Sequence, residues 1–184
     1  MNDDFFETTK PNCPWSLVHK RCLEHDGSIV DLGCIWWDWS RFFIGKKRII
    51  GIDPTENQIA GTELFKGAIS NFNGNGKLTS TGGSGQLIPS VDGFPVLTWT
   101  DFTQKYNINS ISVLKVNIEG SEYDLIKSFT KENFEKIDQL AISFHHFVNR
   151  NWMPRTIESL KIIEDNNFMI KDLGVCGWYL CYKK

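Results

Sequence analysis

Acidic and glycine residues follow two short apolar runs of this sequence, at positions where a parallel sheet would bind a ligand. Asp31-Leu32-Gly33 closes the first run, and Asp53 follows the second. Ligands of open parallel sheets bind beyond the carboxyl ends of the strands. Gly33 permits a tight turn and a close approach of the backbone to a ligand. Asp53 follows Gly33 at about 20 residues, the offset at which a carboxylate meets a ribose in dinucleotide-binding folds. Each position alone could equally be an ordinary turn.

Glu119 and the pair His145-His146 follow two later apolar runs. Glu119 can serve chemistry, or it can simply be a carboxylate favoured at a helix N-terminus. Imidazole titrates near neutral pH and is suited to proton transfer. Adjacent residues of a strand point to opposite faces, so at most one of the two histidines is expected to face a site. A buried structural histidine is at least as expected as a catalytic one. No metal site is predicted, because the pair lacks further ligands.

The elements that position these residues follow from hydrophobic periodicity. Strands are predicted at residues 28–32, 48–52, 65–70, 111–118 and 137–144, with an antiparallel hairpin at 167–182. Helices are predicted at residues 37–44, 100–106 and 119–129, and after Pro154. This alternation predicts an α/β fold with a mainly parallel sheet. The glycine-rich residues 71–90 are predicted to form a loop. Residues 1–27 are predicted to be an N-terminal arm, and residues 28–184 the domain.

The composition excludes several classes of protein. The chain has 184 residues, 41% hydrophobic and 23% charged, as expected of one globular domain with a sizeable core. Its net charge of −2 does not favour binding to nucleic acid. No stretch approaches the ~18 apolar residues of a membrane-spanning helix, and no signal peptide is expected. The five cysteines contain no CxxC pair, which argues against a disulfide framework and favours a reducing, cytoplasmic location.

The order of the segments resembles the FkbM family of S-adenosylmethionine-dependent methyltransferases. The resemblance covers about residues 28–182 and is carried by IVDLGCIWWDWS, IIGIDP, FKGAIS, VLTWTDF, SVLKVNIEGSEYDLI and IDQLAISFHH. Its most specific part is LKVNIEGSEYDLI, which is similar to the family's pattern of a lysine, an acid and then Glu-Gly-x-Glu. The resemblance implies a Rossmann-like class I methyltransferase fold, with a seven-stranded, mainly parallel sheet and a C-terminal antiparallel hairpin.

The resemblance also implies that S-adenosylmethionine is the cofactor and assigns residues to it. Its implied binding residues are Asp31, Gly33, Asp53, Ala68, Ile69 and Asn117. The first two would lie near the methionine part, the third on the ribose, and the next two near the adenine. The mouth of the site would hold Lys115, Asn117 and Glu119.

The chain departs from the family's pattern in two places. Cys34, Ile35 and Trp37 stand where the family has a small residue, an asparagine and a glycine after the first glycine. Trp37 could fill cofactor space, stack on the adenosine, or point away into the core. Asn117 stands where the family has an acid, which removes a possible base or metal ligand.

The sequence therefore predicts a methyltransferase that acts on a hydroxyl of a sugar or another small metabolite. An alcohol nucleophile needs a base, for which His145 or His146 is the first candidate and Glu119 the second. Lys115 would orient the acceptor by charge. One alternative is a binding or scaffold domain that kept the fold and lost catalysis. Another is a different nucleotide-binding enzyme such as a dehydrogenase, which the absence of a GxGxxG pattern disfavours.

Overall fold

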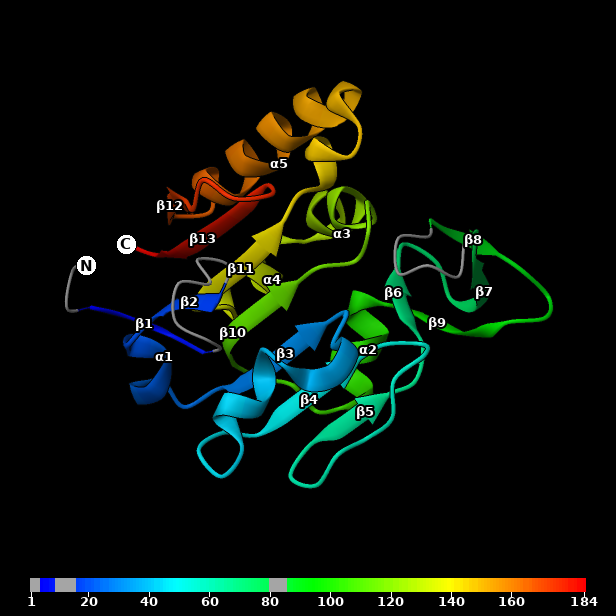
Figure 1. Ribbon diagram of the computed structural model, residues 1–184, viewed down its shortest axis with the longest axis horizontal. Coiled ribbons are helices and arrows are strands. Elements are labelled where there is room, and N and C mark those ends of the chain that lie inside the picture. Colours follow the sequence, from blue (N-terminus) through cyan, green and yellow to red (C-terminus); the bar gives the residue numbers. More distant parts are fainter. Residues whose placement is uncertain (1–3, 9–15, 80–85) are drawn as a thin grey trace.

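The computed structural model describes residues 4–8, 16–79 and 86–184 of the chain, which adopt a mixed α/β fold around a seven-stranded sheet (Figure 1). In the order in which they lie side by side, its strands are β12 (Phe168–Asp172), β13 (Trp178–Lys183), β11 (Gln139–Ser143), β10 (Ile111–Val116), β3 (Ser28–Leu32), β4 (Ile49–Ile52) and β5 (Glu63–Phe65). Five neighbouring strands are parallel to one another: β11, β10, β3, β4 and β5. β13 is antiparallel to both β11 and β12. The sheet is therefore mixed, and the expected C-terminal hairpin is present.

The register of the central strands brings their carboxyl ends to one edge. Leu32 of β3 is opposite Ile52 of β4 and Val116 of β10. Every residue of these three strands is buried, as expected for parallel strands that are covered on both faces. The residues that follow the three strands, Gly33, Asp53 and Asn117, consequently lie next to one another at the same edge.

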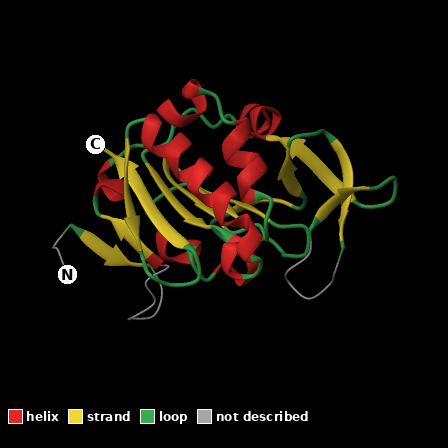
Figure 2. Ribbon diagram, turned by 90° about the horizontal axis from the view of Figure 1, so that it is seen from above, coloured by secondary structure: helices red, strands yellow, loops and turns green. Residues whose placement is uncertain are grey.

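Helices cover the two faces of the sheet unequally (Figure 2). One face is covered by α2 (Trp99–Lys105), α3 (Glu122–Ser128), α4 (Lys131–Glu135) and α5 (Met153–Asp165), which share a core with the even-numbered residues of β3 and β4. The opposite face is covered by β2 (Leu17–His19), α1 (Arg21–Glu24) and two short 3-10 turns, Ile35–Trp37 and Ser40–Phe43. β1 (Phe5–Glu7) pairs with β2. Among the described residues, no helix is long and apolar enough to cross a membrane.

A second, four-stranded sheet stands beside the main one (Figure 1). Its order is β6 (Ala68–Ser70), β9 (Phe94–Thr98), β7 (Gly74–Leu78) and β8 (Leu87–Pro89). The prediction of a plain loop at residues 71–90 is therefore wrong for the part of it that the structure describes. Glycine permits this pairing, because a Cβ on Gly76 would lie 2.8 Å from Leu87 Cδ1 and 2.9 Å from Val96 Cγ2. Residues 80–85 lie outside the described ranges.

The predicted strand at residues 65–70 is also divided between the two sheets. β5 ends at Phe65 and β6 begins at Ala68, and the chain turns between them where the Gly67 amide donates to the Phe65 carbonyl over 2.9 Å. A side chain at Gly67 would clash with the Pro95 carbonyl oxygen at 2.3 Å. The pattern of residues 65–70 therefore did not reveal a turn that only tertiary packing makes necessary.

Three predicted helices differ from the observed ones. The helix expected at residues 37–44 is replaced by two 3-10 turns, because Trp36 and Trp37 have left-handed φ angles of 58° and 56°. The helix expected at residues 119–129 begins at Glu122, since Glu119 also has a positive φ of 56°. α2 begins at Trp99, one residue earlier than the expected helix at residues 100–106, and is capped by the Thr98 hydroxyl.

The predicted N-terminal arm lies partly outside the described residues, and its described part contacts the main sheet. The His19 amide donates to the Gln139 side chain over 3.0 Å, and Arg21 forms an ion pair with Asp138 at 3.2 Å. These contacts join β2 and α1 to the beginning of β11.

Candidate active site

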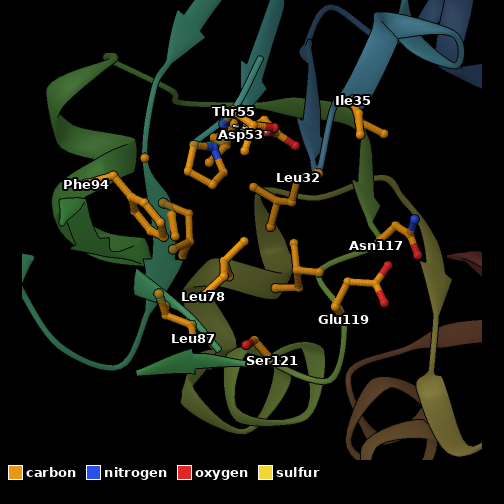
Figure 3. Close-up of a pocket in the computed structure, with 17 residues that line it drawn as sticks. Leu32, Ile35, Asp53, Thr55, Leu78, Leu87, Phe94, Asn117, Glu119 and Ser121 are labelled. Atoms are coloured by element: carbon orange, nitrogen blue, oxygen red, sulfur yellow. Dashed lines mark hydrogen bonds between the residues drawn. The ribbon is translucent and has the colours of Figure 1, made fainter. Parts of the chain in front are cut away.

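A cavity of about 500 Å³ lies at the carboxyl edge of β3, β4 and β10 (Figure 3). Figure 3 shows Asn117 and Glu119 on one side of it and Leu78, Leu87 and Phe94, from the second sheet, on the other. Its volume falls in the range of roughly 300–1,000 Å³ that is usual for small-molecule sites. We call this space the first cavity.

Gly33 lies where the first cavity meets the main sheet. Its φ is +77°, and a Cβ there would lie 2.1 Å from the Asn117 carbonyl oxygen. Because that oxygen belongs to the backbone, it cannot move away cheaply, and no side chain fits. The Gly33 amide donates to the Ile52 carbonyl over 2.8 Å, which fixes the turn that leaves β3.

Asp53 is buried at the end of β4, and its two carboxylate oxygens have different roles. Oδ1 accepts hydrogen bonds from the Thr55 amide at 2.8 Å, the Thr55 hydroxyl at 2.7 Å and the Glu56 amide at 3.2 Å. These bonds build the turn after β4 and fix the carboxylate in place. Oδ2 has no partner among the described residues and lies on a residue that lines the cavity, so it can accept hydrogen bonds from a ligand.

A second cavity of about 370 Å³ adjoins the first. Its lining residues are Asp31, Gly33, Ile35, Trp36, Asp38, Trp39, Lys115, Asn117 and Trp178. Three of these, Gly33, Ile35 and Asn117, also line the first cavity. The two spaces therefore meet at the loop that follows β3.

Lys115 and Asp31 form a buried ion pair beside the second cavity. Lys115 Nζ lies 2.8 Å from Asp31 Oδ1 and donates to the Gly33 carbonyl over 2.6 Å. The ammonium group of Lys115 therefore holds Asp31 and the turn at Gly33 in position. That Lys115 orients an acceptor by its charge stays a prediction.

Glu119, His145 and Glu122 form a carboxylate–imidazole–carboxylate chain. His145 Nδ1 lies 2.6 Å from Glu122 Oε1, and His145 Nε2 lies 3.3 Å from Glu119 Oε2. Glu122 is completely buried, and its Oε2 accepts a hydrogen bond from the Gly120 amide at 2.8 Å. Burial alone would lower the pKa of His145, but the hydrogen bonds and charges of Glu119 and Glu122 outweigh it and raise that pKa to about 9. His145 is therefore an imidazolium at neutral pH.

The sequence predicts that the two histidines point to opposite faces of a strand, and the structure shows that they do not lie on a strand. β11 ends at Ser143, and His145 and His146 belong to a 3-10 turn that spans His145–Phe147. His146 Nδ1 lies 3.2 Å from the Thr156 hydroxyl, and neither histidine lines either cavity. An imidazolium has no free lone pair, so His145 in its charged state cannot accept a proton.

The structure brings most of the predicted site residues together. The residues of the predicted set that line the first cavity are Gly33, Asp53, Ala68, Ile69, Asn117 and Glu119. Those that line the second are Asp31, Gly33, Lys115 and Asn117. Trp37 lines neither cavity. Its side chain is buried and packs against Gly51 of β4. Its Nε1 donates to the Asn57 carbonyl over 2.8 Å. Of the three alternatives for Trp37, the structure therefore supports the core position.

Several residues of the cavities and their surroundings were missed by sequence reasoning. Leu78, Leu87 and Phe94 lie on the strands of the second sheet, part of which was expected to be a loop. Glu122 was visible in the sequence as the second acid of Glu-Gly-x-Glu, but its pairing with His145 depends on residues 23 positions apart. Trp36 and Trp39 belong to the tryptophan cluster after β3, and the composition alone predicted no role for them.

A family model described as the methyltransferase FkbM domain matches residues 22–173. Among solved structures, the chain is similar to the methyltransferase FkbM from Methylobacillus flagellatus KT, with 18% sequence identity and a TM-score of 0.56. That likeness covers 85% of this chain but 43% of the other, and at this identity it concerns the fold alone. No curated protein matches the sequence. Because the family model covers most of the chain, the protein belongs to the FkbM methyltransferase domain family.

Proposed function

We propose that the protein is an S-adenosylmethionine-dependent methyltransferase that transfers a methyl group to a hydroxyl of a small molecule, such as a sugar. The proposal includes a Rossmann-like arrangement of the main sheet, with the cofactor at its carboxyl edge. The observation that carries it is the first cavity, where Gly33 and Asp53 follow neighbouring strands and the Asp53 Oδ2 atom is free to accept hydrogen bonds.

The residues of the first cavity fit an adenosine group. Ala68 and Ile69 of β6, together with Leu78, Leu87 and Phe94 of the other strands of the second sheet, offer an apolar slot for a flat ring. Asp53 lies at the end of this slot with a fixed carboxylate, as a ribose diol requires. The Gly33 backbone carries no side chain and leads from this slot toward the second cavity. We therefore assign the ribose to Asp53 and the methionine part to the neighbourhood of Asp31 and Gly33, beside Asn117.

S-adenosylmethionine, when bound, supplies a methyl group on a positively charged sulfur, which keeps the electron pair of the broken carbon–sulfur bond. The chain must align the acceptor oxygen with that bond and take up the proton that the hydroxyl loses. We assign the proton to Glu119, which lines the first cavity two residues after Asn117 and is 27% exposed. His145 is a fixed, charged neighbour of Glu119. At neutral pH it does not act as the base.

The observation that had raised the alternative of an inactive scaffold is the tryptophan in the loop after Gly33. Trp37 packs into the core and leaves the first cavity open. The departure from the family's pattern therefore does not obstruct the space in which we place the cofactor.

The test is calorimetric titration of S-adenosylmethionine into the parent protein and Asp53→Asn. Asparagine keeps an oxygen for the Thr55 and Glu56 hydrogen bonds, so the turn is preserved while the free acceptor is lost. A hydrogen bond to a charged group contributes about 1.5–3 kcal/mol, so affinity should fall roughly 10- to 150-fold. Asp165→Asn, on the exposed face of α5, is the matched control. Equal affinity of all three proteins would show that Asp53 does not contact the ribose, and absence of binding to the parent would refute the proposed function.

A further inference from the structure

Asp31 is the carboxylate that the resemblance places beside the methionine part of the cofactor, but its oxygens do not reach a ligand. Both carboxylate oxygens are buried, and Oδ1 lies 2.8 Å from the ammonium group of Lys115. The Lys115 side chain is only 8% exposed, so the two charges neutralise each other inside the protein. Asp31 therefore supports the wall of the second cavity without offering it a free acceptor.

Asp38 is the other carboxylate in the described lining of the second cavity. It directly follows the 3-10 turn Ile35–Trp37, on the same loop that leaves β3. In contrast to Asp31, Asp38 is exposed, and it forms no ion pair or side-chain hydrogen bond with the residues that the structure describes. Its negative charge is therefore available to a ligand in this cavity.

Trp36 lines the same cavity and is held with its side chain in solvent. Its φ is 58°, and 69% of its surface is exposed. A left-handed backbone is unfavourable at a non-glycine residue and is concentrated at functional sites. Two charged side chains hold this backbone, because the Trp36 amide donates to Glu56 over 2.5 Å and its carbonyl accepts from Arg41 over 3.0 Å. The fold therefore keeps an indole at the rim of the cavity instead of burying it, as it does for the adjacent Trp37.

A free carboxylate and an aromatic face in one cavity are suited to an ammonium group. The carboxylate accepts hydrogen bonds from N–H groups, and the face of an indole attracts a cation within about 6 Å of its centre. S-adenosylmethionine carries two cationic groups, the sulfonium and the ammonium of its amino-acid part. Asp38 and Trp36 line the second cavity and not the first, where Glu119 lies. Because the methyl group must lie near Glu119, the cation that reaches Asp38 and Trp36 is the ammonium.

We infer that Asp38 and Trp36 bind the ammonium group of S-adenosylmethionine, and that Asp31 does not contact the cofactor directly. This inference rests on the proposed function. Asp31 and Lys115 instead act from within the protein, since Lys115 also donates to the Gly33 carbonyl and so holds the turn against which the cofactor lies. Trp36 stands between Ile35 and Trp37, which depart from the family's pattern, so the contact is a property of this chain.

The test is calorimetric titration of three ligands that share the adenosine group. S-adenosylhomocysteine keeps the ammonium but lacks the sulfonium charge, and 5′-methylthioadenosine lacks the whole amino-acid part. Asp38→Asn and Trp36→Leu should each weaken S-adenosylmethionine and S-adenosylhomocysteine alike, about 3- to 10-fold, and leave 5′-methylthioadenosine unchanged. Trp36→Phe keeps an aromatic face and should lose less than Trp36→Leu. A deaminated analogue of S-adenosylhomocysteine should bind the parent and Asp38→Asn equally well.

Both positions are exposed, so the variants should fold, and thermal unfolding checks this. Asp165→Asn and Ile157→Ala, two exposed changes on α5, are the matched controls and should bind all ligands as the parent does.

The outcomes separate this inference from the proposed function. If the parent binds S-adenosylmethionine and both variants bind it equally well, the ammonium assignment is overturned and the proposed function stands. An equal loss of affinity for 5′-methylthioadenosine would show that the loop acts on the adenosine group, and a loss confined to S-adenosylmethionine would show that the two residues face the sulfonium. Either result contradicts the inference. Absence of cofactor binding to the parent refutes the proposed function, and the inference fails with it.

Discussion

Replacement of Glu122 by glutamine should lower the pKa of His145 and change how the stability of the protein depends on pH. Glu122 is completely buried, and its Oε1 lies 2.6 Å from His145 Nδ1. Glutamine has nearly the same shape, but its single oxygen can accept from the Gly120 amide or from the His145 amide and not from both. The substitution therefore removes a charge and one buried hydrogen bond, while it changes the volume of the side chain little. The charged group that remains beside the imidazole is Glu119, at 3.3 Å.

The expected magnitude follows from the pKa of His145, which is raised from 6.5 to about 9. A group whose pKa is raised in the folded state contributes stability that is complete below its unfolded pKa and is lost as the pH rises through its folded pKa. Each pH unit between the two values corresponds to about 1.4 kcal/mol. The free energy of unfolding should therefore decrease by on the order of 3 kcal/mol between about pH 6.5 and pH 9. In Glu122→Gln, one of the two carboxylates that offset the burial of the His145 imidazolium is lost. The decrease in the free energy of unfolding between pH 6.5 and pH 9 should therefore largely disappear.

The assay combines NMR titration of the histidine ring signals from pH 5 to 10 with urea unfolding at pH 6 and pH 9. His146→Gln is the matched control, because the ring of His146 contacts the neutral Thr156 hydroxyl and should leave the pH dependence unchanged. It also assists assignment, since the chain has four histidines. A parent His145 that titrates near 6.5 would refute the ion-pair chain. A value near 9 that persists in Glu122→Gln would show that Glu122 is not its cause.

Three further substitutions test the surroundings of the two cavities by urea unfolding. Gly33→Ala should destabilise by more than about 2 kcal/mol, because the new methyl group would lie 2.1 Å from the Asn117 carbonyl oxygen at a positive φ; a smaller loss would mean that the β3 turn can move. Trp37→Gly should destabilise by about 3–5 kcal/mol through a core cavity and should not improve cofactor affinity; improved affinity would show that the indole obstructs the site. Lys115→Met should destabilise by about 3–5 kcal/mol, because Asp31 would remain buried and unpaired; a neutral result would mean that water reaches Asp31.

The central strands could be predicted from the sequence because local pattern and tertiary position agree there. β3 coincides with the predicted residues 28–32, since an apolar run that ends in glycine is typical of a strand buried on both faces. β7 and β8 could not be predicted in the same way. β7 is glycine-rich and polar, and β8 has three residues and ends in proline. They form strands because Gly76 allows Leu87 and Val96 to approach closely. That requirement depends on residues distant in sequence, which periodicity does not detect.

The same distinction applies to the site. Gly33, Asp53 and Asn117 could be expected together because parallel strands in register end at one edge. The state of His145 could not be expected, because it depends on Glu122 from a different element and on the 3-10 turn that ends the strand alternation. The position of Trp37 was left open for a similar reason. Whether a tryptophan fills a pocket or a core depends on the left-handed backbone at that position.

The charges around the two cavities give a last argument about what they can bind. The carboxylates that line them are those of Asp31, Asp38, Asp53 and Glu119, with Glu122 behind Glu119. The cations that face these carboxylates are Lys115 and the imidazolium of His145. Lys115 neutralises Asp31, and His145 neutralises one of its two glutamates, so the lining keeps an excess of negative charge. Asp53 is stabilised by N–H and O–H groups, which leave its charge in place. An excess of negative charge in a partly dry site favours a positively charged ligand. A sulfonium cofactor satisfies that condition, whereas an anionic ligand would oppose it.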